Sequence, residues 1–244
     1  MLDGCCGAGG AARGYAEAGF EVWGTDSNPR VARDYERSGG HWLGTGGILD
    51  VLASKRALRE FDFVHVSPPC QHYSQMSRCR PGIAAQYPDL IGPVRELLLA
   101  AGVPYVIENV AAARPWLRDP VTLCGQMFGR PVYRHRLFEA GNGVMLTAPA
   151  AKAHQSANLV KTAAEPRETA RGPLNKECGW PHPVPAARAG HWKPGMYVSV
   201  SGHERKEPVR EAMGIDWMSD RDDVAEAIPP YMTHFLGTQV LAQL

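Results

Sequence analysis

The sequence predicts an open α/β fold built on a largely parallel β-sheet. Through the first 140 residues, short runs rich in β-branched and aromatic residues alternate with segments of helical periodicity, which is typical of βαβ units. The 244 residues, 44 % hydrophobic and 21 % charged, are enough for one globular domain of this class with a modest insert.

The elements can be assigned in chain order. A short apolar start leads into a helix of small and apolar residues, GGAARGYAEAGF, and a strand at 21–25. Asn28 and Pro29 provide the cap and first turn of a helix over 29–38. Amphipathic spacing predicts helices over 48–61 and 89–101. The apolar runs FDFVHVS, VPYVIENV, VTLCG and VYRHRLFE predict strands at 61–67, 103–110, 121–125 and 132–139.

The pattern ends over residues 141–203, where seven prolines fall between Pro149 and Pro194. The net charge is +4 over residues 141–205, against +1 for the whole chain. Basic charge here is compatible with a polyanionic partner, and equally with a solvated surface. Regular patterns return at 207–214, 221–227 and 231–244, so this segment is an irregular insert or subdomain.

Composition also predicts the compartment. There is no run of eighteen apolar residues, and MLDGCCGAGG lacks the basic and apolar regions of a secretory signal, so we expect neither a membrane span nor export. The six cysteines are too scattered for a disulfide scaffold. We expect reduced thiols in a cytoplasmic protein.

A glycine turn, residues 6–10, follows the first strand and opens a helix, while Asp26 ends the next strand. Glycines let a backbone approach a ligand, the helix start offers free N–H groups, and a carboxylate can accept from ribose hydroxyls. The spacing of Gly7, Gly9 and Ala12 also fits a loose dinucleotide fingerprint. A tight turn that binds nothing is the third interpretation.

Three further groups of residues are candidates for chemistry. Cys70 follows two prolines at the carboxyl end of a strand, where open α/β sheets place reactive groups. Glu108 ends another strand, where partial desolvation raises a carboxyl pKa. Arg134 and Arg136 alternate on one strand face and can clamp an anion or a carbonyl. Each also has a purely structural explanation: a lone cysteine, a capping or ion-paired carboxylate, and arginines that pair with core acids.

Together and in this order, these segments resemble the DNA (cytosine-5)-methyltransferase family, in its short prokaryotic or phage-type form. The resemblance covers the chain except for the Pro-rich segment. Motifs of the family are matched by residues 3–10, 68–71 and 108–110, by Arg134 and Arg136, and by residues 210–214 and 225–230. The implied fold is a Rossmann-like S-adenosylmethionine-dependent methyltransferase fold, with helices on both faces of the sheet and a small irregular target-recognition insert.

The resemblance implies methyl transfer from S-adenosylmethionine to carbon 5 of a cytosine flipped out of double-stranded DNA, leaving S-adenosylhomocysteine. It assigns catalysis to Cys70, Glu108, Arg134 and Arg136. It assigns the co-substrate site to Asp3, Cys5, Gly7, Ala8, Gly9, Gly10, Asp26, Ser27, Pro68 and Leu90. It assigns DNA contacts to Gln71, Ser74, Arg78 and Arg80, within a mobile loop at 71–87.

Residues 1–140 and 204–244 are expected to form the catalytic domain, and residues 141–203 the target-recognition region. We expect a monomer without a membrane partner or a metal, of the kind found in restriction–modification systems. Cys178, His182 and His191 provide three zinc-ligand types, but their spacing matches no strong zinc pattern.

Four places in the chain depart from the family. Gly4 and Cys5 replace a Leu-Phe pair whose phenylalanine packs on the co-substrate, and Gly47 replaces an acid that reads adenine. Glu226 replaces an asparagine, and Val132 replaces a glutamine. Asp50 is a candidate substitute for the missing acid. We hypothesise that the donor binds weakly or is a modified sulfonium. Alternative functions are an RNA cytosine methyltransferase and a catalytically weak nucleic-acid-binding module; an oxidoreductase has no use for a Pro-Pro-Cys-Gln loop.

Overall fold

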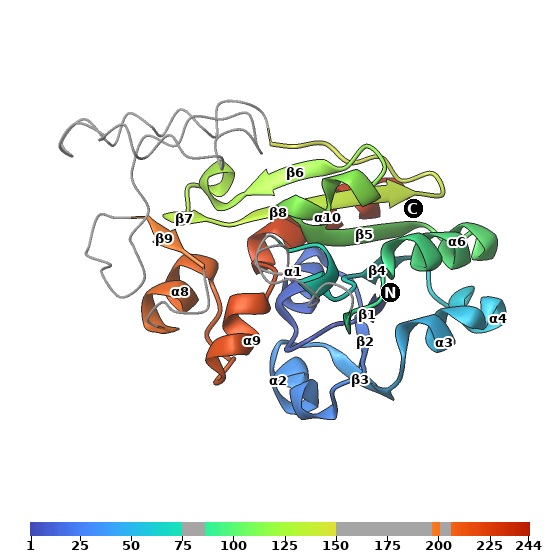
Figure 1. Ribbon diagram of the computed structural model, residues 1–244, viewed down its shortest axis with the longest axis horizontal. Coiled ribbons are helices and arrows are strands. Elements are labelled where there is room, and N and C mark those ends of the chain that lie inside the picture. The colour runs from blue at the N-terminus through green and yellow to red at the C-terminus, as the bar shows by residue number, and fades with distance from the viewer. Residues whose placement is uncertain (75–85, 150–196, 201–205) are drawn as a thin grey trace.

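The computed structural model describes residues 1–74, 86–149, 197–200 and 206–244. Seven strands form one sheet in the order β3-β2-β1-β4-β5-β8-β6 (Figure 1). They are β1 (Leu2–Gly4), β2 (Trp23–Asp26), β3 (His41–Thr45), β4 (Val64–Val66), β5 (Tyr105–Val110), β6 (Val121–Cys124) and β8 (His135–Gly141). The five strands from β3 to β5 in this order are parallel to one another, and β8 runs antiparallel to both β5 and β6. The predicted open, mainly parallel sheet is confirmed.

Helices cover both faces of the sheet. The α-helices among the described residues are α1 (Gly10–Ala18), α2 (Ala32–Arg37), α3 (Ile48–Ala53), α4 (Lys55–Leu58), α6 (Ile91–Ala101), α8 (Lys206–Met213), α9 (Arg221–Glu226) and α10 (Pro230–Leu241). Successive strand residues point to opposite faces. Val106 of β5 therefore joins the apolar cluster of α1 and α10, whereas Ile107 joins the cluster of α3, α4 and α6.

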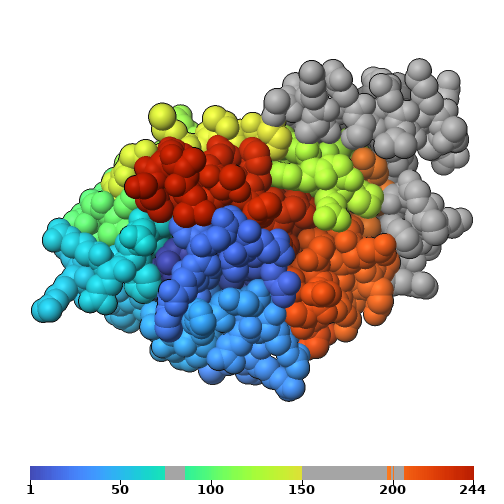
Figure 2. Space-filling view, turned by 180° about the vertical axis from the view of Figure 1, so that it is seen from behind, coloured from blue at the N-terminus to red at the C-terminus, as the bar shows by residue number. Residues whose placement is uncertain are grey.

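The end of the chain packs against its beginning. Figure 2 shows α10 lying beside α1 on the back of the molecule. The two helices touch so closely that the Thr233 hydroxyl donates to the Ala11 carbonyl at 3.0 Å. A Cβ at Gly14 would collide with the Pro230 carbonyl oxygen. This contact places the 221–230 segment next to the glycine turn that precedes α1.

Three elements differ from the sequence prediction. The helix expected over 48–61 is broken at Ser54, whose hydroxyl accepts from the Ala57 N–H at 3.4 Å and starts α4 separately. The strand expected over 132–139 is interrupted at Arg134, so that β7 (Val132–Tyr133) pairs with β9 (Val198–Ser199) in a second sheet. Strand β3 was missed, because this edge strand has alternate residues exposed and lies in a glycine-rich stretch of the chain.

Beyond Gly141 the prediction of a target-recognition region stays a prediction, since most of residues 141–203 lie outside the described residues. The zinc candidates Cys178, His182 and His191 lie outside them as well. In the part of the chain that the structure describes, no helix has the length and apolarity to cross a bilayer.

The contact between α1 and α10 predicts that replacing Gly14 by alanine lowers the stability of the fold more than the same replacement of Gly92. Gly14→Ala drives a Cβ into the backbone of α10, so the free energy of unfolding should fall by about 1–3 kcal/mol. Gly92 lies in α6, and apart from its chain neighbours a Cβ added there would meet nothing within 4 Å. Gly92→Ala should change the free energy of unfolding by less than about 1 kcal/mol, because Pro93 offsets the better helix propensity of alanine. Urea unfolding of both variants measures the difference; equal effects would contradict the packing.

Candidate active site

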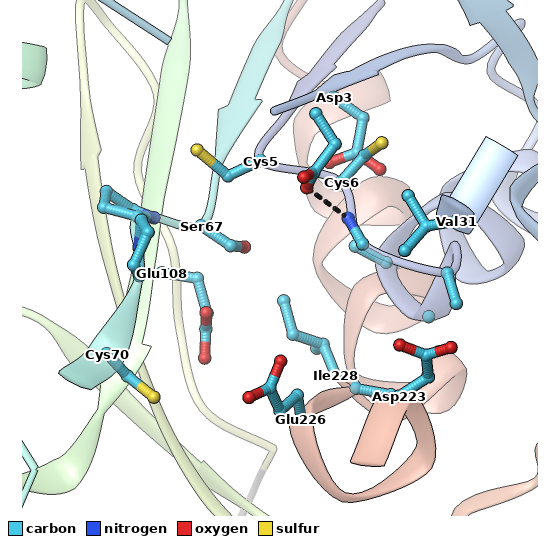
Figure 3. Close-up of a pocket in the computed structure, with 18 of the residues that line it drawn as sticks. Asp3, Cys5, Cys6, Val31, Ser67, Cys70, Glu108, Asp223, Glu226 and Ile228 are labelled. Atoms are coloured by element: carbon cyan, nitrogen blue, oxygen red, sulfur yellow. Dashed lines mark hydrogen bonds between the residues drawn. The ribbon is translucent and has the colours of Figure 1, made fainter. Parts of the chain in front are cut away.

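The carboxyl ends of β1, β2, β4 and β5 surround a cavity of about 320 Å³. Open α/β sheets bind ligands at this edge. The C-terminal segment closes the opposite side of the cavity with Asp223, Glu226 and Ile228. Figure 3 shows the side chains of Cys70, Glu108 and Glu226 pointing into the cavity. The cavity is acidic. Five carboxyl groups and a single guanidinium line it among the described residues: Asp3, Asp26, Glu108, Asp223, Glu226 and Arg136.

The glycine turn forms one wall. Cys5, Gly7 and Gly9 have positive φ angles of 54°, 49° and 86°, a conformation that glycine adopts readily and cysteine does not. A Cβ at Gly7 would meet nothing within 4 Å, so this backbone faces open space. A Cβ at Gly9 would collide with the Ser38 side chain, so Gly9 is needed for packing.

Asp26 holds this turn in place. Its carboxylate accepts from the Gly7 N–H at 3.0 Å and from the Asn28 N–H at 2.8 Å. Each oxygen keeps a further lone pair for a ligand hydroxyl. The two backbone bonds therefore orient the carboxylate at the cavity wall without using up its capacity as an acceptor.

Asp3 lies beneath the turn with no exposed surface. Burial, reinforced by the nearby Asp26 charge, raises the pKa of Asp3 to about 8. The Tyr35 hydroxyl donates to one carboxyl oxygen at 3.5 Å, and the other oxygen has no hydrogen-bond partner among the described residues. A buried polar atom without a partner costs stability, so this oxygen is available to a polar ligand group in the cavity.

The loop after β4 positions Cys70. Its double proline is tied to β5 because the buried Asn109 side chain donates to the Pro68 carbonyl at 2.8 Å. Cys70 then begins the short helix η2 (Cys70–His72), and its carbonyl accepts from the N–H groups of Tyr73 and Ser74 at 3.0 and 2.9 Å. The rigid exit from the strand thus fixes where the thiol sits.

The Cys70 thiol is partly buried, and burial raises its pKa above the usual value, with Glu108 and Glu226 adding to the effect. Arg136 and Arg134 oppose this shift. The thiol is therefore protonated at neutral pH, and a reaction has to remove that proton.

Glu108 is buried on β5, and its carboxylate lies 2.7 Å from the Arg136 Nε. Desolvation raises the Glu108 pKa, whereas Arg136, Arg134 and a hydrogen bond from the Ser67 hydroxyl lower it. The result is a carboxyl group that can hold or release a proton inside the cavity.

The two arginines bind the C-terminal segment through its backbone. An Arg134 terminal nitrogen donates to the Ala227 carbonyl at 2.7 Å, and one of Arg136 donates to the Glu226 carbonyl at 3.4 Å. Both side chains are buried. Burial and the neighbouring Arg136 charge lower the Arg134 pKa. The arginines therefore hold the 226–227 segment against Glu108.

Most of the residues predicted from the sequence line this cavity: Asp3, Cys5, Gly7, Ala8, Gly10, Asp26, Ser27, Pro68, Cys70, Gln71, Glu108 and Arg136. Four do not: Gly9, Ser74, Leu90 and Arg134. The backbone N–H of Leu90 instead donates to the Tyr73 hydroxyl at 2.9 Å. Arg78 and Arg80 lie outside the described residues.

Cys6, from the glycine turn, and Ile228, from the matched segment 225–230, line the cavity as well. Sequence reasoning gave no role to Val31, Ser67 and Asp223, which also line it. Ser67 adjoins the double proline, so its place was open to inference. The place of Asp223 depends on the packing of α10 against α1, which no local sequence pattern predicts.

One departure from the pattern of the resembled family, at Gly4, has a local explanation. A Cβ at Gly4 would lie 2.5 Å from the Ile48 Cδ1 atom, so Ile48 occupies the space that a side chain at position 4 would need. Cys5 lines the cavity with a much smaller side chain than phenylalanine. Neither Gly47 nor Asp50 is among the lining residues. Within the described residues, no cluster of three or more His, Cys, Asp or Glu side chains is arranged to hold a metal ion.

No protein-family model and no curated protein sequence matches the chain. Its structure is similar to a proposed DNA modification methyltransferase encoded within a prophage (E. coli), at 12 % identity and TM-score 0.62, covering 99 % of this chain and 98 % of the other. It is similar to the Entamoeba histolytica methyltransferase EhMeth at 13 % identity and TM-score 0.54, covering 99 % and 97 %. These two likenesses, with the sheet described above, show a Rossmann-like methyltransferase fold.

The buried Asp3 predicts a pH dependence of stability. Its folded pKa of about 8 lies above the unfolded value near 3.8, so the folded state retains a proton that the unfolded state loses. The contribution of Asp3 to the free energy of unfolding is fully present below about pH 4. It declines by up to about 1.4 kcal/mol per pH unit as the pH rises toward 8.

Asp3→Asn removes this titration. Urea unfolding of the ligand-free protein should show that the stability of the wild type falls relative to that of Asp3→Asn between about pH 5 and pH 7, by roughly 2–3 kcal/mol. Parallel pH dependences would show that Asp3 is ionised in the folded state.

Proposed function

We propose that this chain is a DNA (cytosine-5)-methyltransferase. One observation carries the proposal: the Cys70 thiol, the Glu108 carboxyl and the Arg136 guanidinium share one cavity with the glycine turn and Asp26. A nucleophile and a proton donor at one end of a cavity, with a nucleotide-type site at the other, match transfer of a small group to a base. The methyltransferase fold supports the same conclusion.

The chemistry assigned to Cys70 and Glu108 follows from the weakness of cytosine carbon 5 as a nucleophile. The Cys70 thiol loses its proton to solvent and forms a bond to carbon 6, which moves the electron pair of the 5,6 double bond to carbon 5. Glu108 supplies a proton to ring nitrogen 3 and so limits the charge that develops there. Carbon 5 would then form a bond to the methyl group of the co-substrate while the bond from that methyl group to the sulfonium sulfur breaks. Loss of the carbon 5 proton to solvent re-forms the double bond, expels the Cys70 sulfur and returns the nitrogen proton to Glu108.

The cavity residues fit S-adenosylmethionine. When bound, this co-substrate supplies an electrophilic methyl group on a sulfonium centre. Asp26 would accept from ribose hydroxyls, and the unpartnered Asp3 oxygen and the surplus of carboxyl groups suit a cationic ligand. The small Cys5 side chain offers less contact area than phenylalanine, which underlies the hypothesis of weak donor binding. A calorimetric titration giving ordinary micromolar affinity would exclude that hypothesis.

Arg136 would hold the carbonyl of the target base. Its three nitrogens already contact Glu108, the His135 carbonyl and the Glu226 carbonyl, but each terminal nitrogen has a second hydrogen to donate. Arg134 would act indirectly, by holding the 226–227 segment in place. The two arginines thus have different roles despite their spacing of two residues.

Double-stranded DNA is the proposed partner. A base inside the duplex cannot reach Cys70, so the cytosine must be flipped out, at a cost of a few kcal/mol. Gln71 lines the cavity beside Cys70, and Ser74, Arg78 and Arg80 are proposed to contact the DNA from the loop that follows. Residues 141–203 are proposed to select the target sequence, and the setting is proposed to be the cytoplasm.

Cys70→Ser tests the nucleophile. The variant should keep the fold and DNA binding but lose methyl transfer by roughly a thousandfold or more, because an alcohol is a far weaker nucleophile than a thiolate. With duplex DNA containing 5-fluorocytosine, the wild type should form a covalent complex that survives denaturing electrophoresis, since the fluorine blocks the final elimination.

Cys124→Ala is the matched control, because Cys124 is buried in the apolar cluster of α1 and α10, away from the cavity; it should form the complex. A parallel assay on transfer RNA identifies the substrate class. Methyl transfer by Cys70→Ser, or a wild type that forms no complex with DNA, would refute the proposal.

A further inference from the structure

A chain of polar side chains runs from helix α1 to the catalytic carboxyl. The Tyr15 hydroxyl lies 3.0 Å from the His65 Nδ1, and the His65 Nε2 lies 2.8 Å from the Ser67 hydroxyl. The Ser67 side chain in turn lies beside the Glu108 carboxyl and lowers its pKa. Figure 3 shows Ser67 and Glu108 side by side at the cavity wall. The chemistry proposed above gives no role to Tyr15 or His65.

Both inner members of the chain are completely buried and neutral. Tyr15 and His65 have no exposed surface, and the aromatic rings of Phe63 and Phe20 pack against Tyr15. Burial lowers the pKa of His65 to about 3 and raises that of Tyr15. His65 therefore carries one ring proton at neutral pH, on either Nδ1 or Nε2.

The position of that proton is coupled to the state of Glu108. If Tyr15 donates to Nδ1, then Nε2–H donates to Ser67, and the Ser67 hydroxyl is free to donate to an ionised Glu108. If Nδ1–H donates to Tyr15, the Ser67 hydroxyl donates to Nε2 instead, and its oxygen can accept only from a protonated Glu108. The Nε2–H tautomer of His65 therefore lets the Ser67 hydroxyl donate to Glu108 in either protonation state of the carboxyl, whereas the Nδ1–H tautomer suits only a protonated Glu108.

We infer that His65 and Ser67 are positioning residues that orient Glu108 and stabilise its carboxylate after it has given its proton to the base. This inference rests on the proposed function. With His65 protonated on Nε2, no proton has to travel along the chain: the Glu108 proton moves to ring nitrogen 3, the Ser67 hydroxyl donates to the new carboxylate, and the proton returns to Glu108 at elimination. If His65 had only a structural role, its contact with Ser67 would have no effect on the reaction.

Ser67→Ala cuts the chain at the cavity, and Ser67→Thr keeps the hydroxyl. With 5-fluorocytosine duplex, Ser67→Ala should slow covalent-complex formation by roughly 10- to 100-fold, the usual effect of losing a hydrogen bond to a charged group. Ser67→Thr should restore most of the rate. Ser54→Ala, which removes the hydroxyl that starts α4 outside the cavity, should leave the rate unchanged.

The pH dependence of the rate of covalent-complex formation distinguishes a positioning role of Ser67 from a role in protein stability alone. The titratable and charged groups that interact with Glu108 are Arg136, Arg134, Cys70 and Tyr15. Because the Ser67 hydroxyl lowers the Glu108 pKa, Ser67→Ala should move the alkaline limb of the rate to higher pH. Glu108→Gln should abolish that limb and so identify it.

The tautomer of His65 gives a readout that needs no activity. Nuclear magnetic resonance of the wild type with isotope-labelled histidine should show His65 neutral and protonated on Nε2 once Glu108 is ionised. Protonation on Nδ1 in that state, or a Ser67→Ala variant that loses stability but keeps the wild-type rate and pH limb, would overturn the inference. A wild type that forms no covalent complex would refute the proposed function instead, while leaving the tautomer result to decide the hydrogen-bond chain.

Discussion

A carboxyl group buried at the end of β5 is the constraint around which this site is arranged. An isolated ionised carboxylate in a protein interior costs several kcal/mol, and Glu108 is 5 % exposed. Arg136 at 2.7 Å, the nearby Arg134 and the Ser67 hydroxyl offset that cost. Desolvation outweighs these contributions and raises the pKa of Glu108 above its ordinary value, so the carboxyl can carry the proton that a general acid has to donate.

The same arginines connect the two ends of the chain. Their terminal nitrogens bind the Glu226 and Ala227 carbonyls, and α10, which follows, packs on α1 through Gly14 and Thr233. The glycine turn, the Glu108 carboxyl and the C-terminal wall are thereby fixed relative to one another. Glu226 brings a carboxylate into the cavity as a consequence.

The sequence was most informative where strands end. Cys70 and the turn around Gly7 each follow a recognisable apolar strand, Glu108 lies near the carboxyl end of another, and parallel strands place such residues at one edge of a sheet. It was least informative where long-range packing decides: Asp223 reaches the cavity only because α10 docks on α1. His65 was hidden inside an apolar run, and the break at Arg134 follows from pairing of β7 with β9, a contact between residues more than sixty positions apart in the printed sequence.

The central claim is that Cys70 and Glu108 act together on carbon 5 of cytosine in DNA. Mass spectrometry of nucleosides from the DNA of bacteria that express the chain tests it most directly, with a strain lacking its own cytosine methylation as the host. The account predicts 5-methylcytosine in that DNA, and none when the chain is not expressed. DNA without 5-methylcytosine, or with methyl groups only on exocyclic amines, would contradict it.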